Sequence, residues 1–233
     1  MTTIKLLWEK VHRRWVRMRF QPIRVFCFHQ VSDEFEPDTM ELCDWMHTEV
    51  FKKNILMLKR SYTFISLPEA TYHLKHDCFR LKRYVVLTAD DGWASMKNIL
   101  PWLAEQNISI ALFLNPSYLD GKHYRKRDSE KYLTYEEIDS FERSGNNVSV
   151  ASHGWRHVNN TQLSSNEIKK EIENAAKELE RFHSVIPYYA YPWGRHNVTT
   201  DGLLKGYDLI PVLMDGQGNY NDPTMIHREL LMK

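Results

Sequence analysis

Several features that would narrow the class of the protein at once are scarce in this chain. Only three of its 233 residues are cysteines, and Cys27, Cys43 and Cys78 are widely spaced. An odd and scattered set of this kind does not form a disulfide framework and is compatible with a reducing compartment. The formal net charge is +1, so there is no global positive field, and we do not expect nucleic acid as a partner.

Long apolar runs are also missing. No stretch reaches the roughly 18 consecutive apolar residues of a membrane-spanning helix, so the sequence predicts no membrane span. Residues 1–20 carry too many charges to contain the apolar segment of a secretory signal. We therefore expect the protein in the cytoplasm or at the inner face of the membrane. Its composition, with 42% hydrophobic and 26% charged residues, is typical of a globular domain that buries a sizeable core.

Residues 1–22 form a basic N-terminal segment, for which we predict an amphipathic helix that ends at Pro22. Its apolar face carries two tryptophans, and lysines and arginines crowd the remaining surface. Such a helix either packs its tryptophan face on the domain, or lies on an anionic membrane as a peripheral contact through residues 4–20. Both interpretations stay open. We predict that residues 23–233 form one domain.

Short apolar segments alternate with helical segments along this domain. We expect strands at residues 24–28, 62–66, 84–89, 109–114, 147–151, 188–191, 207–213 and 225–231. We expect helices at residues 46–60, 68–74, 96–106, 134–145, 164–182 and 201–206, and a loop at residues 31–45. This alternation is typical of parallel strands joined by crossover helices. About six to seven such units favour a closed α/β barrel over a small open sheet.

Polar clusters follow or close several of the predicted strands. These clusters are His29, Asp90 with Asp91, His153 with His157, and the Tyr-Pro-Trp-Gly stretch at residues 191–194. In a parallel barrel all carboxyl ends of the strands open on one face, where active sites lie, so we expect these residues to converge. The neighbouring carboxylates repel each other unless a positive group lies between them or one stays protonated.

A metal ion is the positive group that the histidines suggest. His153 and His157 are four residues apart, and on one helical turn they would share a face and bind one cation. In a chain with 11 histidines, such a pair alone also arises by chance in surface or capping positions. With a nearby aspartate, however, two imidazoles and one carboxylate leave coordination positions open, which is the arrangement that activates water. One aspartate would be a ligand and the other a general base.

Three motifs resemble those of the polysaccharide deacetylase family, also known as the NodB-homology or carbohydrate esterase 4 family. They are Thr-Ala-Asp-Asp-Gly at residues 88–92, Ser-His-Gly-Trp-Arg-His at 152–157, and Tyr-Pro-Trp-Gly at 191–194. The resemblance covers about residues 23–230, and it implies that the domain at 23–233 is catalytic and is a distorted (β/α)7 barrel. It implies a hydrolase that uses a divalent metal to remove acetyl groups from N-acetylated sugars.

The resemblance also implies roles for individual residues. Asp90 would be the general base, and Asp91, His153 and His157 would bind the metal. We expect Zn²⁺, although the same donor set accepts iron, cobalt, nickel or manganese. The expected substrate is an N-acetylated polysaccharide or glycan precursor. Nothing in the sequence indicates an oligomeric state.

The general acid has two candidates. Many family members carry it in a C-terminal Leu-x-His motif, and the nearest counterpart here is His227. Residues 25–31, Val-Phe-Cys-Phe-His-Gln-Val, resemble instead the N-terminal strand of the permuted poly-N-acetylglucosamine deacetylase branch, which implies His29. The position at a strand end favours His29, because His227 falls inside a predicted strand.

Aromatic residues beside the motifs are candidates for binding the sugar. Tyr191, Pro192 and Trp193 form the last motif, and Trp93 and Trp155 lie in or next to the others. Indole faces pack on sugar rings, although packing in the barrel core is an equal alternative. A backbone N–H near Tyr191 is expected to help to stabilise an oxyanion.

The chain departs from the family pattern at three positions. Ala89 replaces the usual phenylalanine, Gly154 replaces serine or threonine, and Ala190 replaces an arginine. None of these changes removes a predicted ligand or the base. Fold does not fix substrate, so two alternatives remain: hydrolysis of O-acetyl esters or another linear amide, and an inactive glycan-binding protein.

Overall fold

The computed structural model describes residues 21–35, 45–77, 80, 82–119, 132–145 and 147–231. The predicted helix at residues 1–22, apart from its last two positions, lies outside this range, as do Cys43 and Cys78. Cys27 is buried and has a free thiol. Among the helices in the described ranges, none combines the length and apolar character needed to cross a membrane.

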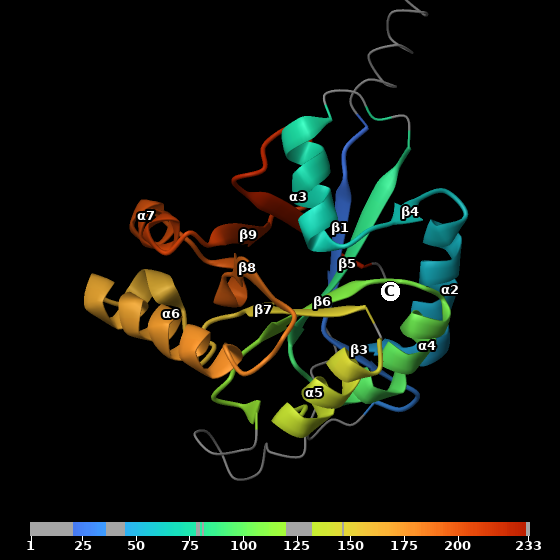
Figure 1. Cartoon of the computed structure of the whole chain (residues 1–233), viewed down its shortest axis with the longest axis horizontal. Coiled ribbons are helices and arrows are strands. Elements are labelled where there is room, and N and C mark those ends of the chain that lie inside the picture. Colours follow the sequence, from blue (N-terminus) through green and yellow to red (C-terminus); the bar gives the residue numbers. More distant parts are fainter. Residues whose placement is uncertain are drawn as a thin grey trace, which may run out of the picture.

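Parallel strands close into a barrel (Figure 1). In the order β1-β10-β9-β8-β7-β6-β5 each strand pairs with the next, and β5 pairs back with β1. Their bounds are β1 Arg24–Phe28, β5 Tyr84–Asp91, β6 Ile110–Leu114, β7 Val148–Ser152, β8 Val185–Ala190, β9 Ile210–Met214 and β10 Ile226–Leu230. The short β4, Thr63–Phe64, pairs with the start of β5. The predicted (β/α)7-type barrel is therefore confirmed.

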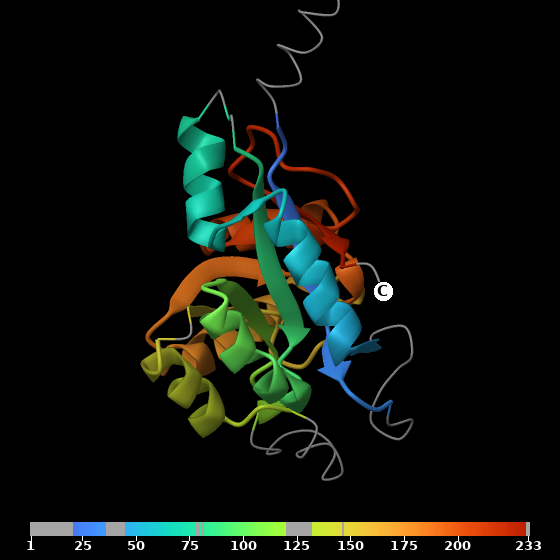
Figure 2. The same ribbon diagram turned by 90° about the vertical axis from the view of Figure 1, so that its right-hand side faces the viewer.

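Helices surround the barrel on its outside (Figures 1 and 2). They are α2 Thr48–Lys59, α3 Leu67–His76, α4 Leu100–Glu105, α5 Tyr135–Arg143, α6 Ser165–Leu179 and α7 Val198–Gly206. Capping boxes begin α5 at Thr134 and α6 at Ser164, as the sequence predicts, because each cap is followed three residues later by a glutamate. On α6 the residues at helical spacing, among them Ile168 and Leu179, are buried against the strands.

The first strand closes the barrel between the last strand and β5. Phe26 of β1 is opposite Glu229 of β10 on one side, and Phe28 is opposite Ala89 of β5 on the other. This register brings the residue after β1, His29, next to Asp90. Because both sides of β1 are paired and its side chains after Arg24 are apolar, four of its five residues are buried.

Two predicted elements differ from the structure. The expected loop at residues 31–45 begins and ends in short parallel strands, β2 Gln30–Ser32 and β3 Trp45–His47, and residues 36–44 lie outside the described ranges. Val31 and Met46 are paired and buried there. Burial of these apolar side chains stabilises strands in a segment whose acidic composition predicts a loop. The expected helix at 96–106 is divided into a 3-10 helix, Ala94–Asn98, and α4, because Pro101 lacks the N–H that would continue one helix through it.

Candidate active site

Asp90 and Asp91 end β5, and both residues are buried. Successive residues of a strand point to opposite sides, and the chain then turns, with φ of 70° at Asp91 and 74° at Gly92. A Cβ on Gly92 would lie 2.7 Å from the Leu114 side chain, so a larger residue would require Leu114 to shift in addition to adopting a positive φ. The two carboxylates therefore face different partners.

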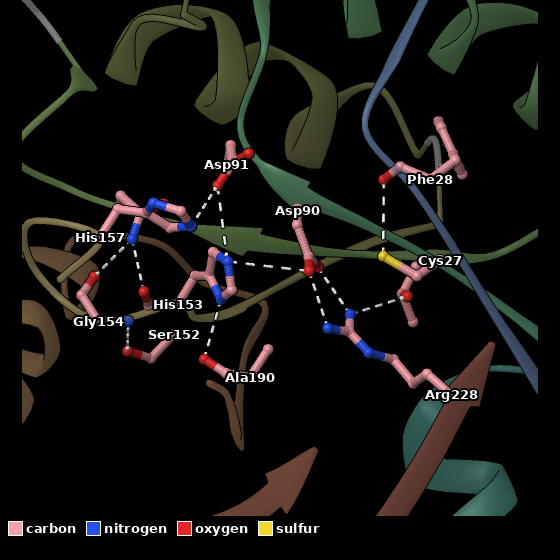
Figure 3. Close-up of polar contacts among 12 residues, drawn as sticks. Cys27, Phe28, Asp90, Asp91, Ser152, His153, Gly154, His157, Ala190 and Arg228 are labelled. Atoms are coloured by element: carbon pink, nitrogen blue, oxygen red, sulfur yellow. Dashed lines mark hydrogen bonds and ion pairs between the residues drawn. The ribbon is translucent and has the colours of Figure 1, made fainter. Parts of the chain in front are cut away.

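Asp91 faces both histidines of the second motif (Figure 3). Its Oδ1 lies 3.6 Å from His153 Nε2 and 3.4 Å from His157 Nε2. One ligand atom from each of the three side chains lies within 4.8 Å of the other two. The structure thus brings together the three residues that the sequence suggests as metal ligands.

The donor atoms of this cluster fit a divalent cation. Within the described part of the chain, Asp91 Oδ1 is buried and has no hydrogen-bond partner, and an unpaired buried carboxylate oxygen is costly. His153 Nδ1 lies 2.9 Å from the backbone carbonyl of Ala190. This contact places the proton on Nδ1 and leaves the Nε2 lone pair directed towards Asp91, as in metal sites whose histidines are oriented by a carbonyl.

The two histidines do not lie on a helical turn, which corrects the sequence-based prediction. Residues 153–157 form an irregular loop after β7, with positive φ at Gly154 (79°) and His157 (52°). A Cβ on Gly154 would approach the Tyr189 hydroxyl to 3.0 Å, so a larger residue would have to displace this hydroxyl and adopt a positive φ. The turn in this loop, rather than helical spacing, brings the second imidazole to Asp91.

Hydrogen bonds from neighbouring elements hold this loop in place. Asn115, directly after β6, donates from Nδ2 to the carbonyls of residues 153 and 154, at 2.5 and 3.3 Å. The Tyr118 hydroxyl donates to the carbonyl of Arg156 at 3.1 Å. Buried Glu171 of α6 accepts from the Arg156 backbone N–H at 3.0 Å and from its guanidinium. The sequence analysis did not predict these contacts. Two features of the sequence could have indicated them: Asn115 follows a predicted strand, and Glu171 lies within the apolar face of a predicted helix.

Arg228 of β10 holds the other carboxylate. Its Nη1 and Nη2 donate to Asp90 Oδ1 and Oδ2 at 2.7 and 2.8 Å, and both side chains are buried. Burial is the largest single effect and would raise the pKa of Asp90, but the charge and hydrogen bonds of Arg228, together with the nearby His153 and His29, outweigh it and lower that pKa below its ordinary value. Asp90 is therefore ionised at neutral pH.

The sequence does not reveal the role of Arg228, because the pattern of β10 does not show whether Arg228 or its neighbour His227 faces the barrel interior. The two residues alternate along β10, so Arg228 points inward while His227 points to the outer face. On that face His227 Nδ1 lies 2.7 Å from Asp215 Oδ2. The structure thus places His227 away from the carboxylate that it would have to assist.

His29 lies on the Asp90 side of the site. Ligand-type atoms of Cys27, His29 and Asp90 also lie within 4.8 Å of one another. Electrostatics disfavours a cation at this second cluster, because both oxygens of Asp90 already bind the Arg228 guanidinium. Burial raises the pKa of the Cys27 thiol well above its ordinary value, so it stays protonated and is a poor ligand. His29 is therefore a neighbour of Asp90 rather than a metal ligand.

The aromatic candidates have different environments. Trp193 is 66% exposed, and its ring centroid lies 4.9 Å from that of His157. The Tyr191 side chain is buried and its hydroxyl donates to Asp201 at 2.6 Å, so it faces the core, and Pro192 is also buried. Trp155 is half-buried beside the Arg156 guanidinium, 5.3 Å from its ring. Trp193 is the member of the motif at residues 191–194 whose side chain is open to solvent beside the histidines.

Comparison with known proteins places the chain in a family. The family model "Polysaccharide deacetylase" matches residues 80–210, which is more than half of the chain and includes all three motifs. The chain therefore belongs to the polysaccharide deacetylase family. A comparison with curated proteins gave no match.

Solved structures show the same fold. The deacetylase PplD of Streptococcus pyogenes, solved with acetate, is similar with a TM-score of 0.76 and 19% identity over 90% of this chain and 92% of that one. IcaB from Ammonifex degensii gives 0.77 and 18% over 90% and 91%. A de-N-acetylase from Aggregatibacter actinomycetemcomitans gives 0.72 and 17% over 91% and 95%. At these identities the likeness shows the fold alone.

Proposed function

We propose that the protein is a metal-dependent N-deacetylase of an acetylated glycan. The observation that carries this proposal is the convergence of Asp91, His153 and His157 beside the Asp90–Arg228 pair, in a chain of the polysaccharide deacetylase family. The named function of two similar structures, a deacetylase and a de-N-acetylase, supports the same reaction class.

Asp91, His153 and His157 would hold the divalent cation. When bound, the cation supplies Lewis acidity, which lowers the pKa of water and polarises the carbonyl of an acetamide. The donor set of two imidazoles and one carboxylate suits Zn²⁺ and leaves coordination positions for water and substrate. Without a cation, burial and the neighbouring His153 lower the pKa of His157 to about 4. The His157 imidazole is therefore neutral and able to ligate at neutral pH.

Asp90 takes the proton of the attacking water. It is ionised at neutral pH, and a carboxylate oxygen that accepts from arginine still has a second lone pair for water. Its Oδ2 lies 3.8 Å from His153 Nε2, so a water next to the ligand atoms is also within reach of Asp90. Arg228 fixes the carboxylate in this orientation, which reduces the reorganisation needed for reaction.

His29 is the proposed general acid. In the reaction the oxygen of water bonds to the acetyl carbon, and the carbon–nitrogen bond breaks. Asp90 receives the proton of the water, and protonated His29 gives its proton to the departing amine. The products are acetate and a free amino sugar. Trp193 is a candidate wall for the sugar ring, because its exposed indole at a strained left-handed φ of 61° is maintained beside the site.

Acetate release from a matched panel of glycans tests this function. We expect release from N-acetylglucosamine oligomers by the metal-loaded protein, and loss of at least 100-fold in Asp90→Asn, as is usual when a general base is removed. Faster release from O-acetylated sugars than from the N-acetylated oligomers would show that the protein is an esterase and would refute the proposed N-deacetylase function. A metal-loaded protein that binds these oligomers without releasing acetate would instead support the inactive glycan-binding alternative.

A further inference from the structure

The two oxygens of Asp91 have different partners. Oδ1 faces His153 and His157. Oδ2 accepts a hydrogen bond from the indole Nε1–H of Trp93, at 3.0 Å. The sequence leaves sugar contact and core packing as equal alternatives for Trp93, but in the structure its polar atom is directed at the carboxylate two positions earlier.

Packing fixes the Trp93 ring in this orientation. Tyr132 stacks on it, with ring centroids 4.7 Å apart and an angle of 25° between the planes. The two residues also form a backbone bridge, and the Leu133 N–H donates to the carbonyl of Gly92 at 2.7 Å. The indole is thus held from both its ring face and its backbone.

The aromatic cluster of Trp93, Tyr118 and Tyr132 connects both sides of the proposed metal site. The Tyr118 and Tyr132 rings are 4.8 Å apart, and the Tyr118 hydroxyl donates to the carbonyl of Arg156, next to His157. One end of the cluster therefore supports the ligand on β5, and the other supports the loop that carries a histidine ligand.

We propose that Trp93 is a positioning residue for the metal site, with a role that rests on the proposed function. Its N–H binds Oδ2 of Asp91, which opposes rotation of the carboxylate and keeps Oδ1 directed at His153 and His157. Indole is a donor only, so this contact suits an ionised carboxylate and is lost with phenylalanine. Partners of this kind, which hydrogen-bond to a ligand, typically change metal affinity about 10–100-fold when they are removed.

Metal affinity of Trp93→Phe tests the proposal, because phenylalanine keeps a ring for Tyr132 but removes the donor. Metal-free protein is titrated with Zn²⁺ against a chromophoric chelator. We expect the dissociation constant of Trp93→Phe to rise about 10–100-fold while the Tm of the metal-free protein stays near the wild-type value. Trp102→Phe is the matched control, because Trp102 lies on α4 and packs on Phe51 outside the site. Its Zn²⁺ affinity should stay within about twofold of wild type, well below the change expected for a contact to a ligand.

Asp91→Ala separates failure of this inference from failure of the proposed function. Wild-type Zn²⁺ affinity in Asp91→Ala would refute the metal site itself. Weak binding in Asp91→Ala with wild-type binding in Trp93→Phe would overturn only the role of Trp93. Trp93→Leu, which also lacks the donor, replaces Trp93→Phe if the latter does not fold, with the same expected loss.

Kinetics at saturating Zn²⁺ distinguish positioning from sugar contact. If Trp93 acts through Asp91, Trp93→Phe with excess metal should keep the wild-type KM for an N-acetylglucosamine oligomer. A raised KM together with unchanged Zn²⁺ affinity would contradict the positioning role and assign Trp93 to the substrate.

Discussion

The guanidinium of Arg228 binds both oxygens of Asp90, at 2.7 and 2.8 Å, although the two residues are 138 positions apart. Closure of the barrel between β10, β1 and β5 brings them together. The two adjacent carboxylates therefore have different partners. The charge of Asp90 is balanced by an arginine, and Asp91 faces two histidines. In the proposed mechanism, a cation bound by Asp91 would therefore lie next to an ionised carboxylate that is held by arginine and is not needed as a ligand.

Removing Arg228 should destabilise the protein. Arg228→Met leaves Asp90 buried without its partner, and breaking a buried pair in this way costs about 3–5 kcal/mol. Urea unfolding of the metal-free protein measures the change. In a double-mutant cycle, Arg228→Met combined with Asp90→Asn should cost clearly less than the two single changes together, because no uncompensated charge remains. Additive costs would show that the pair has no energetic coupling.

Substitution of His29 and substitution of His227, the two candidate acids, should have very different effects on turnover. His29→Gln should lower kcat for acetate release about 100-fold or more, since general acid catalysis typically contributes at least that factor. His227→Gln is the matched control, because its imidazole contacts Asp215 on the outer face of β10, and its kcat should remain near wild type. The assignment is reversed if the His227 variant loses activity and the His29 variant keeps it.

The stability of the metal-free protein should fall as the pH is lowered from about 6.5 to about 4. In the fold, burial and His153 lower the pKa of His157 from 6.5 to about 4. Over this window the unfolded chain binds a proton that folded His157 does not, so acid favours unfolding. The change amounts to roughly 3 kcal/mol at most, and below the window both states are protonated.

Urea unfolding across this pH range, with His157→Gln as the control, measures that contribution. Glutamine does not titrate, so the variant should show a shallower dependence on pH. Equal slopes for both proteins would mean that folded His157 titrates near its ordinary pKa.

Strong local patterns account for what could be predicted from the sequence. Apolar runs such as the one that ends at Asp91, and capping boxes such as Thr134 with Glu137, were sufficient to predict the order of the elements and the closed barrel. The polar residues at the strand ends followed from the same reasoning, because parallel strands present their carboxyl ends on one face. The convergence of Asp91 with His153 and His157, and of His29 with Asp90, could be predicted in this way.

The features that escaped prediction depend on three-dimensional contacts. The loop after β7 reaches Asp91 through positive φ at Gly154 and His157, a backbone conformation that spacing alone does not reveal. The carbonyl of Ala190 orients His153 through main-chain atoms, which carry no sequence signal. Arg228 was missed because which face of β10 enters the barrel depends on register, and a shift of one residue would have exchanged it with His227.

Titration of the metal-free protein with Zn²⁺, followed by acetate release from an N-acetylglucosamine oligomer, tests the central claim most directly. We predict that metal-free protein is inactive and that turnover rises with added Zn²⁺ to a plateau near one equivalent per chain, as expected if Asp91, His153 and His157 form the proposed metal site. Asp90→Asn should bind the same equivalent of metal without regaining turnover. Full acetate release by protein shown to be free of metal would contradict the account.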